Sequence, residues 1–221
     1  MKNDPAFTRS CRRISVIVLF CFVIISGSCT MWILKATGNI KNPKLENSET
    51  IKKYCAENND PYDVLWLPSN KENFESILNR YPGIPTVLIY DRKNTLLENA
   101  NGEECQKMLI SFFSDSLKYK YKVVNDSSLS YLRSRIKPID TGNLFENYDY
   151  VVVYSWVKYV PKITEDLFQR LSAVKATDKR KICFISLNKD WQQGMYDKAP
   201  KLNGKVQSDG KASAPKQVAQ P

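Results

Sequence analysis

The chain has 221 residues, of which 43% are hydrophobic and 25% are charged, a composition typical of one globular domain with accessory segments. It contains no histidine, which excludes a Ser-His-Asp triad, histidine zinc ligands and the usual general base near neutral pH. Lys and Arg total 33 against 23 Asp and Glu, a formal net charge of +10. Because the lysines are spread along the chain, we interpret this charge as a solvated surface and expect no nucleic-acid partner.

The cysteine pattern argues against a metal centre or a dithiol site. None of the cysteines forms a C-x-x-C motif, so we expect no metal and no cofactor. Cys183 lies in the apolar run "ICFISL" and is interpreted as a small buried hydrophobic residue. Whether Cys55 and Cys105 pair is left open by the sequence. The six cysteines are Cys11, Cys21, Cys29, Cys55, Cys105 and Cys183.

The N-terminal segment predicts a membrane anchor. Residues 1–13 carry four basic side chains, and residues 14–34 are free of charge. At about 1.5 Å per residue, such a run is long enough to cross about 30 Å of hydrocarbon as a helix. The basic stub should stay in the cytoplasm, so the chain that follows the anchor is expected on the extracytoplasmic side.

Two alternatives to a retained anchor use the same segment. A secretory signal could be cleaved after the small residues "SGS". A lipoprotein signal would place a lipid on Cys29, although Ser26 stands where such signals carry a Leu-like residue. All three readings bring the domain to the outer side of a membrane.

The first part of the chain after the anchor predicts an alternation of helices and strands. The helix after the first strand is opened by a capping box, Ser69–Glu72, and stopped by "PG". The elements are a polar tether at 35–45, a helix at 48–58 capped by Ser48, a strand at 63–67, a helix from Ser69, a strand Thr86–Tyr90, a return strand Thr95–Glu98 and a helix from Gly102 to about Leu117.

The second part predicts the centre of the sheet. The run Tyr150–Tyr154 is continuously apolar, as expected of a strand that is buried on both faces. The other elements are an edge strand at 118–124, a short helix within 126–137 that ends before Pro138, a loop at 139–149, a helix Ile163–Lys175, a strand Ile182–Leu187 and a disordered Lys- and Pro-rich tail at 193–221. We therefore expect an α/β domain over residues 46–192, with a central mixed sheet and helices on both faces.

Two stretches resemble thioredoxin-like proteins. Residues 64–113, "VLWLPSNKENFESILNRYPGIPTVLIYDRKNTLLENANGEECQKMLISFF", are similar to the later half of that family: strand, helix, Gly-Ile-Pro-Thr turn, hairpin and last helix. By this resemblance, Pro85 is the proline that is cis and faces the active site.

Residues 151–190, "VVVYSWVKYVPKITEDLFQRLSAVKATDKRKICFISLNKD", resemble the earlier half. In membrane-anchored thiol-disulfide oxidoreductases the strand leads into Trp-Ala-x-Trp-Cys-x-x-Cys. By this resemblance, Trp156 and Tyr159 take the tryptophan positions and Val160 and Ile163 take the cysteine positions. Pro161 and Lys162 lie between the last two. We call residues 156–163 the Trp–Pro segment.

The two stretches occur in swapped order, which implies a permuted or composite sheet with Tyr150–Tyr154 inserted beside Thr86–Tyr90. The alternative is an ordinary α/β domain in which Trp156 and Pro161 merely end a strand and begin a helix. Thiol exchange requires a thiolate and a resolving thiol, which Val160 and Ile163 cannot provide.

The sequence therefore predicts an exported, anchored, redox-inactive domain for binding or scaffolding at the cell envelope. Its partners would be the membrane, through residues 14–34 or a lipid on Cys29, and an envelope protein. The alternatives are a single-thiol enzyme that uses Cys55 or Cys105, and a subunit of an envelope or secretion complex. The expected binding notch consists of Trp156, Tyr159, Val160, Pro161, Ile163 and Pro85.

Overall fold

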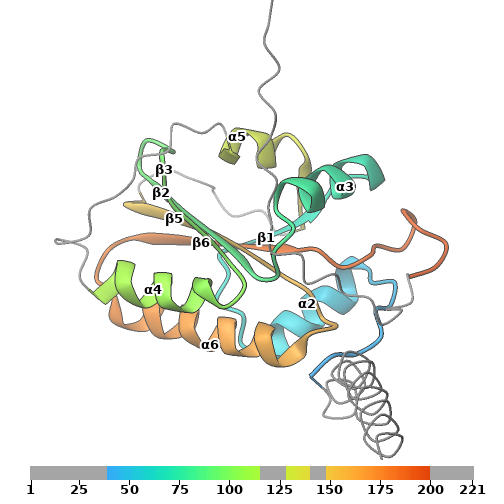
Figure 1. Cartoon of the computed structure of the whole chain (residues 1–221), viewed down its shortest axis with the longest axis horizontal. Helices are drawn as coiled ribbons and strands as arrows, with labels where there is room; N and C mark the ends of the chain where they lie inside the picture. Colours follow the sequence, from blue (N-terminus) through green and yellow to red (C-terminus); the bar gives the residue numbers. More distant parts are fainter. Residues whose placement is uncertain (1–38, 115–127, 140–147, 200–221) are drawn as a thin grey trace, which may run out of the picture. The chain divides into compact units, whose positions relative to one another are not determined.

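The computed structural model describes residues 39–114, 128–139 and 148–199, which form an α/β domain around one six-stranded mixed sheet (Figure 1). No helix in these ranges is long and apolar enough to cross a membrane. The predicted anchor at 14–34, Cys29 and the predicted strand at 118–124 lie outside them. The elements are α2 (Ser48–Glu57), β1 (Val64–Pro68), α3 (Lys71–Arg80), β2 (Thr86–Asp91), β3 (Leu96–Asn101), α4 (Glu104–Ser114), α5 (Ser128–Arg133), β4 (Ile136–Pro138), β5 (Tyr150–Trp156), α6 (Pro161–Thr177) and β6 (Ile182–Asn188).

The sheet has the order β3-β2-β5-β6-β1-β4, so β5 and β6, from the later part of the domain, lie together between β2 and β1. β5 pairs in parallel with β6 and antiparallel with β2, and Thr86 lies opposite Ser155. The predicted central position of Tyr150–Tyr154, beside Thr86–Tyr90, is thereby confirmed. The physical reason is the apolar run itself, because Val151 to Trp156 are all buried and need cover on both faces.

Helices cover both faces of the sheet, as predicted (Figure 1). α2, α4 and α6 pack on one face, against alternate residues of β5 such as Val152 and Tyr154. α3 and α5 pack on the other face, against Val151 and Val153. This alternation follows from the strand period of two residues, which sends neighbouring side chains to opposite layers.

Two helix caps lie one residue away from the predicted positions. Asn47, rather than Ser48, caps α2, and its side-chain oxygen accepts from Thr50 N at 2.9 Å. Asn70, rather than Ser69, caps α3 through a 2.8 Å bond from Asn73 N. Asn and Ser have similar capping strength, so a local pattern does not decide between adjacent candidates.

The segment before Pro138 contains a strand that the sequence pattern did not predict. The helix α5 ends at Arg133, and β4 then pairs antiparallel with β1, with Trp66 opposite Pro138. β4 is an edge strand of three residues, a place where proline's missing N–H is tolerated.

The ordered chain also extends beyond the boundary predicted at residue 192. Gln193 N donates to Glu46 O at 2.8 Å, and the ring of Tyr196 contacts Phe74 with centroids 5.7 Å apart. These contacts attach residues 193–196 to the domain.

Candidate functional site

The Trp–Pro segment lies where β5 ends and α6 begins. Trp156 is fully buried, and its indole Nε1 donates to Ser186 Oγ at 2.6 Å. The same ring meets Phe168 of α6 edge-on at 5.2 Å. Pro161 occupies the first turn of α6, where its missing N–H costs nothing. Trp156 therefore acts as a core residue that fixes the end of β5.

α2 covers Trp156 on the side that the sequence analysis expected to be open. The ring of Tyr54 stacks on the indole at 5.4 Å with an interplanar angle of 18°. Lys158 Nζ lies 5.6 Å from the centre of the Tyr54 ring. An apolar pocket at Trp156 is thus filled by a side chain of the protein itself.

Pro85 is brought to the same edge of the sheet as Trp156. The Ile84–Pro85 peptide bond is cis, as the resemblance implied, and Pro85 is buried. Because Thr86 pairs with Ser155, Pro85 directly precedes β2 at the level where β5 ends. A hydrogen bond from Thr86 N to Ser155 Oγ, 3.1 Å long, reinforces this register.

The remaining predicted site residues form the accessible part of the Trp–Pro segment. Tyr159 and Val160 are half-buried, and Ile163 is 44% exposed. Tyr159 packs against Trp191 with ring centroids 5.6 Å apart. Burial and the nearby Asp190 carboxylate raise the pKa of Tyr159 to about 12, so its hydroxyl is neutral at physiological pH.

Residues 39–47, which include part of the predicted tether, lie across the Trp–Pro segment, and we call them the strap. Lys41 N donates to Tyr159 O at 2.7 Å, and Glu46 N donates to Trp191 O at 2.8 Å. Glu46 is buried and accepts from Lys158 Nζ at 2.7 Å. The strap therefore joins the two loops that follow β5 and β6.

A charged cluster after β6 was missed by the sequence analysis. Asp190 is almost fully buried; both carboxylate oxygens accept from Lys158 N, and one also accepts from Asn188 Nδ2 at 2.7 Å. Burial raises the pKa of Asp190 to about 7, against the effect of these hydrogen bonds. The available signal was the charged pair "KD" directly after an apolar strand.

Lys189 is the other member of this cluster. Its side chain is 1% exposed and donates to Tyr81 O at 2.8 Å and to Gly83 O at 2.7 Å. Burial lowers the pKa of Lys189 to about 7. Through these bonds to main-chain oxygens, the Lys189 ammonium stabilises the turn that precedes Pro85.

A third buried group, Asp60, connects the loop after α2 to the sheet. It accepts from Tyr154 Oη and, at 2.8 Å, from Ser186 Oγ, the same hydroxyl that receives the Trp156 indole. Burial raises the pKa of Asp60 to about 6, and hydrogen bonds from Tyr154 and Ser186 oppose the shift. The network fixes Trp156 in one orientation.

The three described cysteines, Cys55, Cys105 and Cys183, are all free and buried. Cys55 and Cys105 are therefore not paired. Burial raises the pKa of Cys55, assisted by Asp60, and raises the pKa of Cys105 to about 11 and of Cys183 to about 12. A raised pKa keeps each thiol in the protonated, unreactive form.

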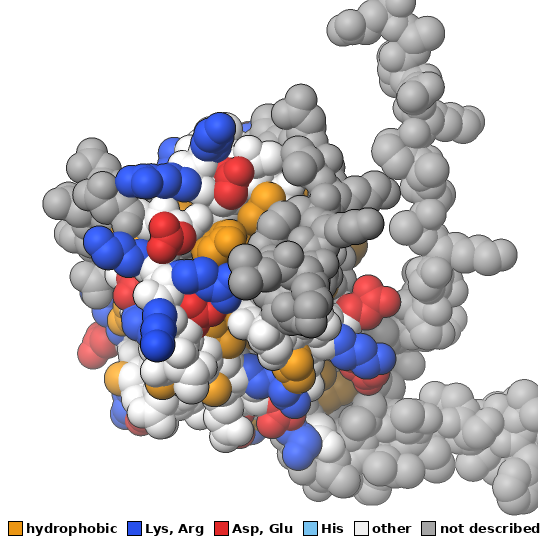
Figure 2. Space-filling view, turned by 90° about the vertical axis from the view of Figure 1, so that its left-hand side faces the viewer, with side chains coloured by type: hydrophobic (Ala, Val, Ile, Leu, Met, Phe, Trp, Pro, Cys, Tyr) orange, Lys and Arg blue, Asp and Glu red, His pale blue; other side chains and the backbone are white. Residues whose placement is uncertain are grey.

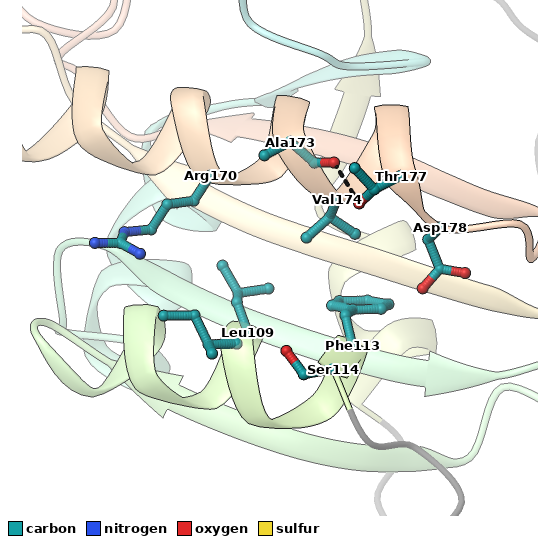
Figure 3. A pocket seen from close by; sticks show the side chains of 9 residues that line it. Leu109, Phe113, Ser114, Arg170, Ala173, Val174, Thr177 and Asp178 are labelled. Atoms are coloured by element: carbon teal, nitrogen blue, oxygen red, sulfur yellow. Dashed lines mark hydrogen bonds between the residues drawn. The ribbon is translucent and has the colours of Figure 1, made fainter.

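A separate groove of about 320 Å³ lies between α4 and the C-terminal half of α6 (Figure 3). Leu109, Phe113 and Val174 line it between the two helices, while Arg170 and Asp178 stand at its two ends. Ile110, which is 53% exposed, also borders it. The groove contains none of the predicted site residues.

Charge is mixed on the face shown in Figure 2. Lys and Arg side chains alternate there with Asp and Glu, and hydrophobic atoms lie between them. The net positive charge is therefore not gathered into one patch on the visible part of this face. Within the described ranges, no group of three or more His, Cys, Asp or Glu side chains is placed to hold a metal ion.

No match to this chain is found among protein-family models, curated proteins or solved structures.

Proposed function

We propose that this chain is an exported, membrane-anchored domain of thioredoxin-like architecture that lacks redox cysteines and acts in binding or scaffolding at the cell envelope. The observation that carries the proposal is the Trp–Pro segment. It has a buried Trp156 and Pro161 at the first turn of α6, while the positions of the two thiols hold Val160 and Ile163.

The topology supports this architecture. β5, α6 and β6 form a strand-helix-strand unit in which the two strands are parallel. The hairpin β2–β3 lies beside this unit, and its strand β2 pairs antiparallel with β5. α4 follows the hairpin, as the last helix does in the family that the sequence resembles. In this proposal the two halves are exchanged in chain order, so β5 completes the sheet from the far end of the chain.

Ile163 is the side chain through which we expect a partner to bind. It is one of two large hydrophobic residues exposed among the described residues, and it stands at the start of α6 beside Tyr159 and Val160. An exposed aliphatic side chain near half-buried aromatic rings is a suitable contact for another protein.

Photocrosslinking in native membranes tests the binding role. A photoreactive residue at position 163 of the full chain should capture a discrete protein, whereas the same residue at Ile110, the other exposed hydrophobic position, should not. Equal capture at both positions, or none at position 163, would refute binding through this surface.

The redox part of the proposal has its own assay. The full chain should not accelerate insulin reduction by a dithiol. Activity that disappears in a Cys55→Ser or Cys105→Ser variant would favour the single-thiol enzyme instead. Protease added to intact spheroplasts should digest the domain, because the proposed orientation places it outside the cytoplasm.

A further inference from the structure

The strap is bound as an extended chain would be bound by a peptide-recognition site. Glu46 pairs with Gln192 in a parallel bridge; Glu46 N donates to Trp191 O, and Gln193 N donates to Glu46 O, both at 2.8 Å. Five residues earlier, Lys41 N donates to Tyr159 O at 2.7 Å. We call the surface that provides these partners the strap groove; its main-chain groups can bind any chain of extended backbone.

The side chains of the strap differ in burial. Pro43 and Glu46 are buried, whereas Lys41, Asn42 and Lys44 are exposed. The two buried side chains stand three residues apart and give the strap the pattern Pro-x-x-Glu.

Lys158 recognises the acid. Its ammonium is 2.7 Å from Glu46 Oε2, and its side chain is 24% exposed, so it is accessible from solvent beside the strap. Asp190, on the loop after β6, accepts hydrogen bonds from the main-chain N of Lys158. A charge-assisted bond of this kind is stronger than one between neutral groups.

We propose that the strap groove is a binding site for an extended peptide that carries a Pro-x-x-Glu pattern. The strap occupies the site in the free protein, and an acidic segment of a partner protein replaces it. This inference rests on the proposed binding function and names the chemistry of the partner.

Hydrogen exchange on the full chain tests displacement without any substitution. The probe is a synthetic peptide with the sequence of residues 39–47, NIKNPKLEN, added in excess. The main-chain amides of Lys41 and Glu46 in the chain should then exchange faster, because their acceptors on the strap groove are taken by the peptide. A scrambled peptide of the same composition should leave both rates unchanged.

Direct binding tests the role of the acid. Glu46→Ala in the chain weakens the strap, so a fluorescent NIKNPKLEN peptide should bind this variant about tenfold more tightly than the wild type. A peptide with Glu46→Gln should bind the same variant several-fold more weakly than the native peptide, because it cannot pair with Lys158 as an anion.

A charge exchange distinguishes recognition from a structural role. In a Glu46→Ala, Lys158→Glu chain, the preference should reverse, so that a peptide with Glu46→Lys binds better than the native peptide. The control is Lys53→Glu, which breaks the exposed Lys53–Glu57 pair of 3.8 Å and should change no affinity. Melting temperatures and far-UV circular dichroism of each variant verify folding.

Three results would overturn the inference: unchanged exchange of the Lys41 and Glu46 amides at saturating peptide, equal binding of the scrambled peptide, or an unchanged preference after the charge exchange. If the Glu46→Ala variant does not fold, the exchange measurement on the wild type decides alone. Crosslinking at position 163 can succeed while these assays fail, so the two proposals are tested separately.

Discussion

Tyr54 and Trp156 lie face to face, with ring centroids 5.4 Å apart and ring planes inclined by 18°. The pair links α2, near the beginning of the domain, to the end of the central strand β5. The Tyr54 ring also covers Trp156, which the sequence alone suggested as part of an accessible aromatic surface. The accessible part of the Trp–Pro segment therefore includes Tyr159, Val160 and Ile163.

Two substitutions of Tyr54 should have different effects on stability. Tyr54→Ala removes the stacked ring and should lower the free energy of unfolding by about 1–3 kcal/mol, less than the loss of a fully buried aromatic side chain because Tyr54 is half-buried. Tyr54→Phe should leave stability unchanged or raise it by up to about 1 kcal/mol, because the buried Tyr54 hydroxyl has no hydrogen-bond partner. Urea unfolding measures both. A Phe variant as unstable as the Ala variant would contradict this account.

Gly83 should not tolerate a side chain. A Cβ at this position would lie 2.5 Å from Asn101 Oδ1 and 2.6 Å from Asn101 Cβ. Gly83→Ala should therefore cost about 1–3 kcal/mol of unfolding free energy by overpacking. The matched control is the same substitution in an Asn101→Gly background, where the clash is absent and the cost of Gly83→Ala should vanish. A cost that persists there would place its cause in the backbone of the turn.

Lys189 should make stability increase with pH. Its folded-state pKa of about 7 is below its ordinary value of 10.5, so above pH 7 the unfolded state binds more protons than the folded state. Between pH 7 and 8.5 this difference should add about 1–2 kcal/mol to the free energy of unfolding. The increase should be lost in Lys189→Met and kept in Lys181→Met, whose side chain is exposed. Urea titrations at the two pH values provide the measurement.

Cys55, Cys105 and Cys183 should resist alkylation in the folded chain. With a pKa of about 11, Cys105 is a thiolate in roughly one molecule in a thousand at pH 8, and all three thiols are buried. N-ethylmaleimide followed by peptide mapping should find these three positions unmodified before urea is added and modified afterwards. Rapid labelling of Cys55 or Cys105 in the native protein would instead support the hypothesis of a single-thiol enzyme.

The central strand could be predicted from the sequence because a strand that is buried on both faces is a continuous run of apolar residues. Val151 to Val153 have to be apolar wherever they come in the chain, so β5 could be placed in the middle of the sheet. The short strand β4 has no such apolar run. Its residues Ile136 to Pro138 are half-buried or exposed, and it exists through its pairing with β1, which is distant in sequence.

The site was predicted less completely than the fold. Trp156, Pro161 and Pro85 could be assigned to one edge of the sheet from pattern and resemblance, and the register of β2 and β5 brings them there. The covering of Trp156 by Tyr54 could not be foreseen, because nothing local to "IKKYCAEN" specifies which side chain it meets. The polar "KD" after β6 was a visible signal, but its burial depends on partners distant in sequence: Tyr81 and Gly83 for Lys189, and Lys158 for Asp190.

The strand order also has a consequence for the timing of folding. β1 and β2 are separated in the sheet by β6 and β5, which come last in the chain among the strands of the described ranges. The first part of the domain can form the pairs β2–β3 and β1–β4 but no continuous sheet, and the inner edges of β1 and β2 stay unpaired until β6 and β5 are available. A chain that emerges from its N-terminal end, whether from a ribosome or through a membrane channel, must be kept from aggregating until nearly all of the domain has appeared.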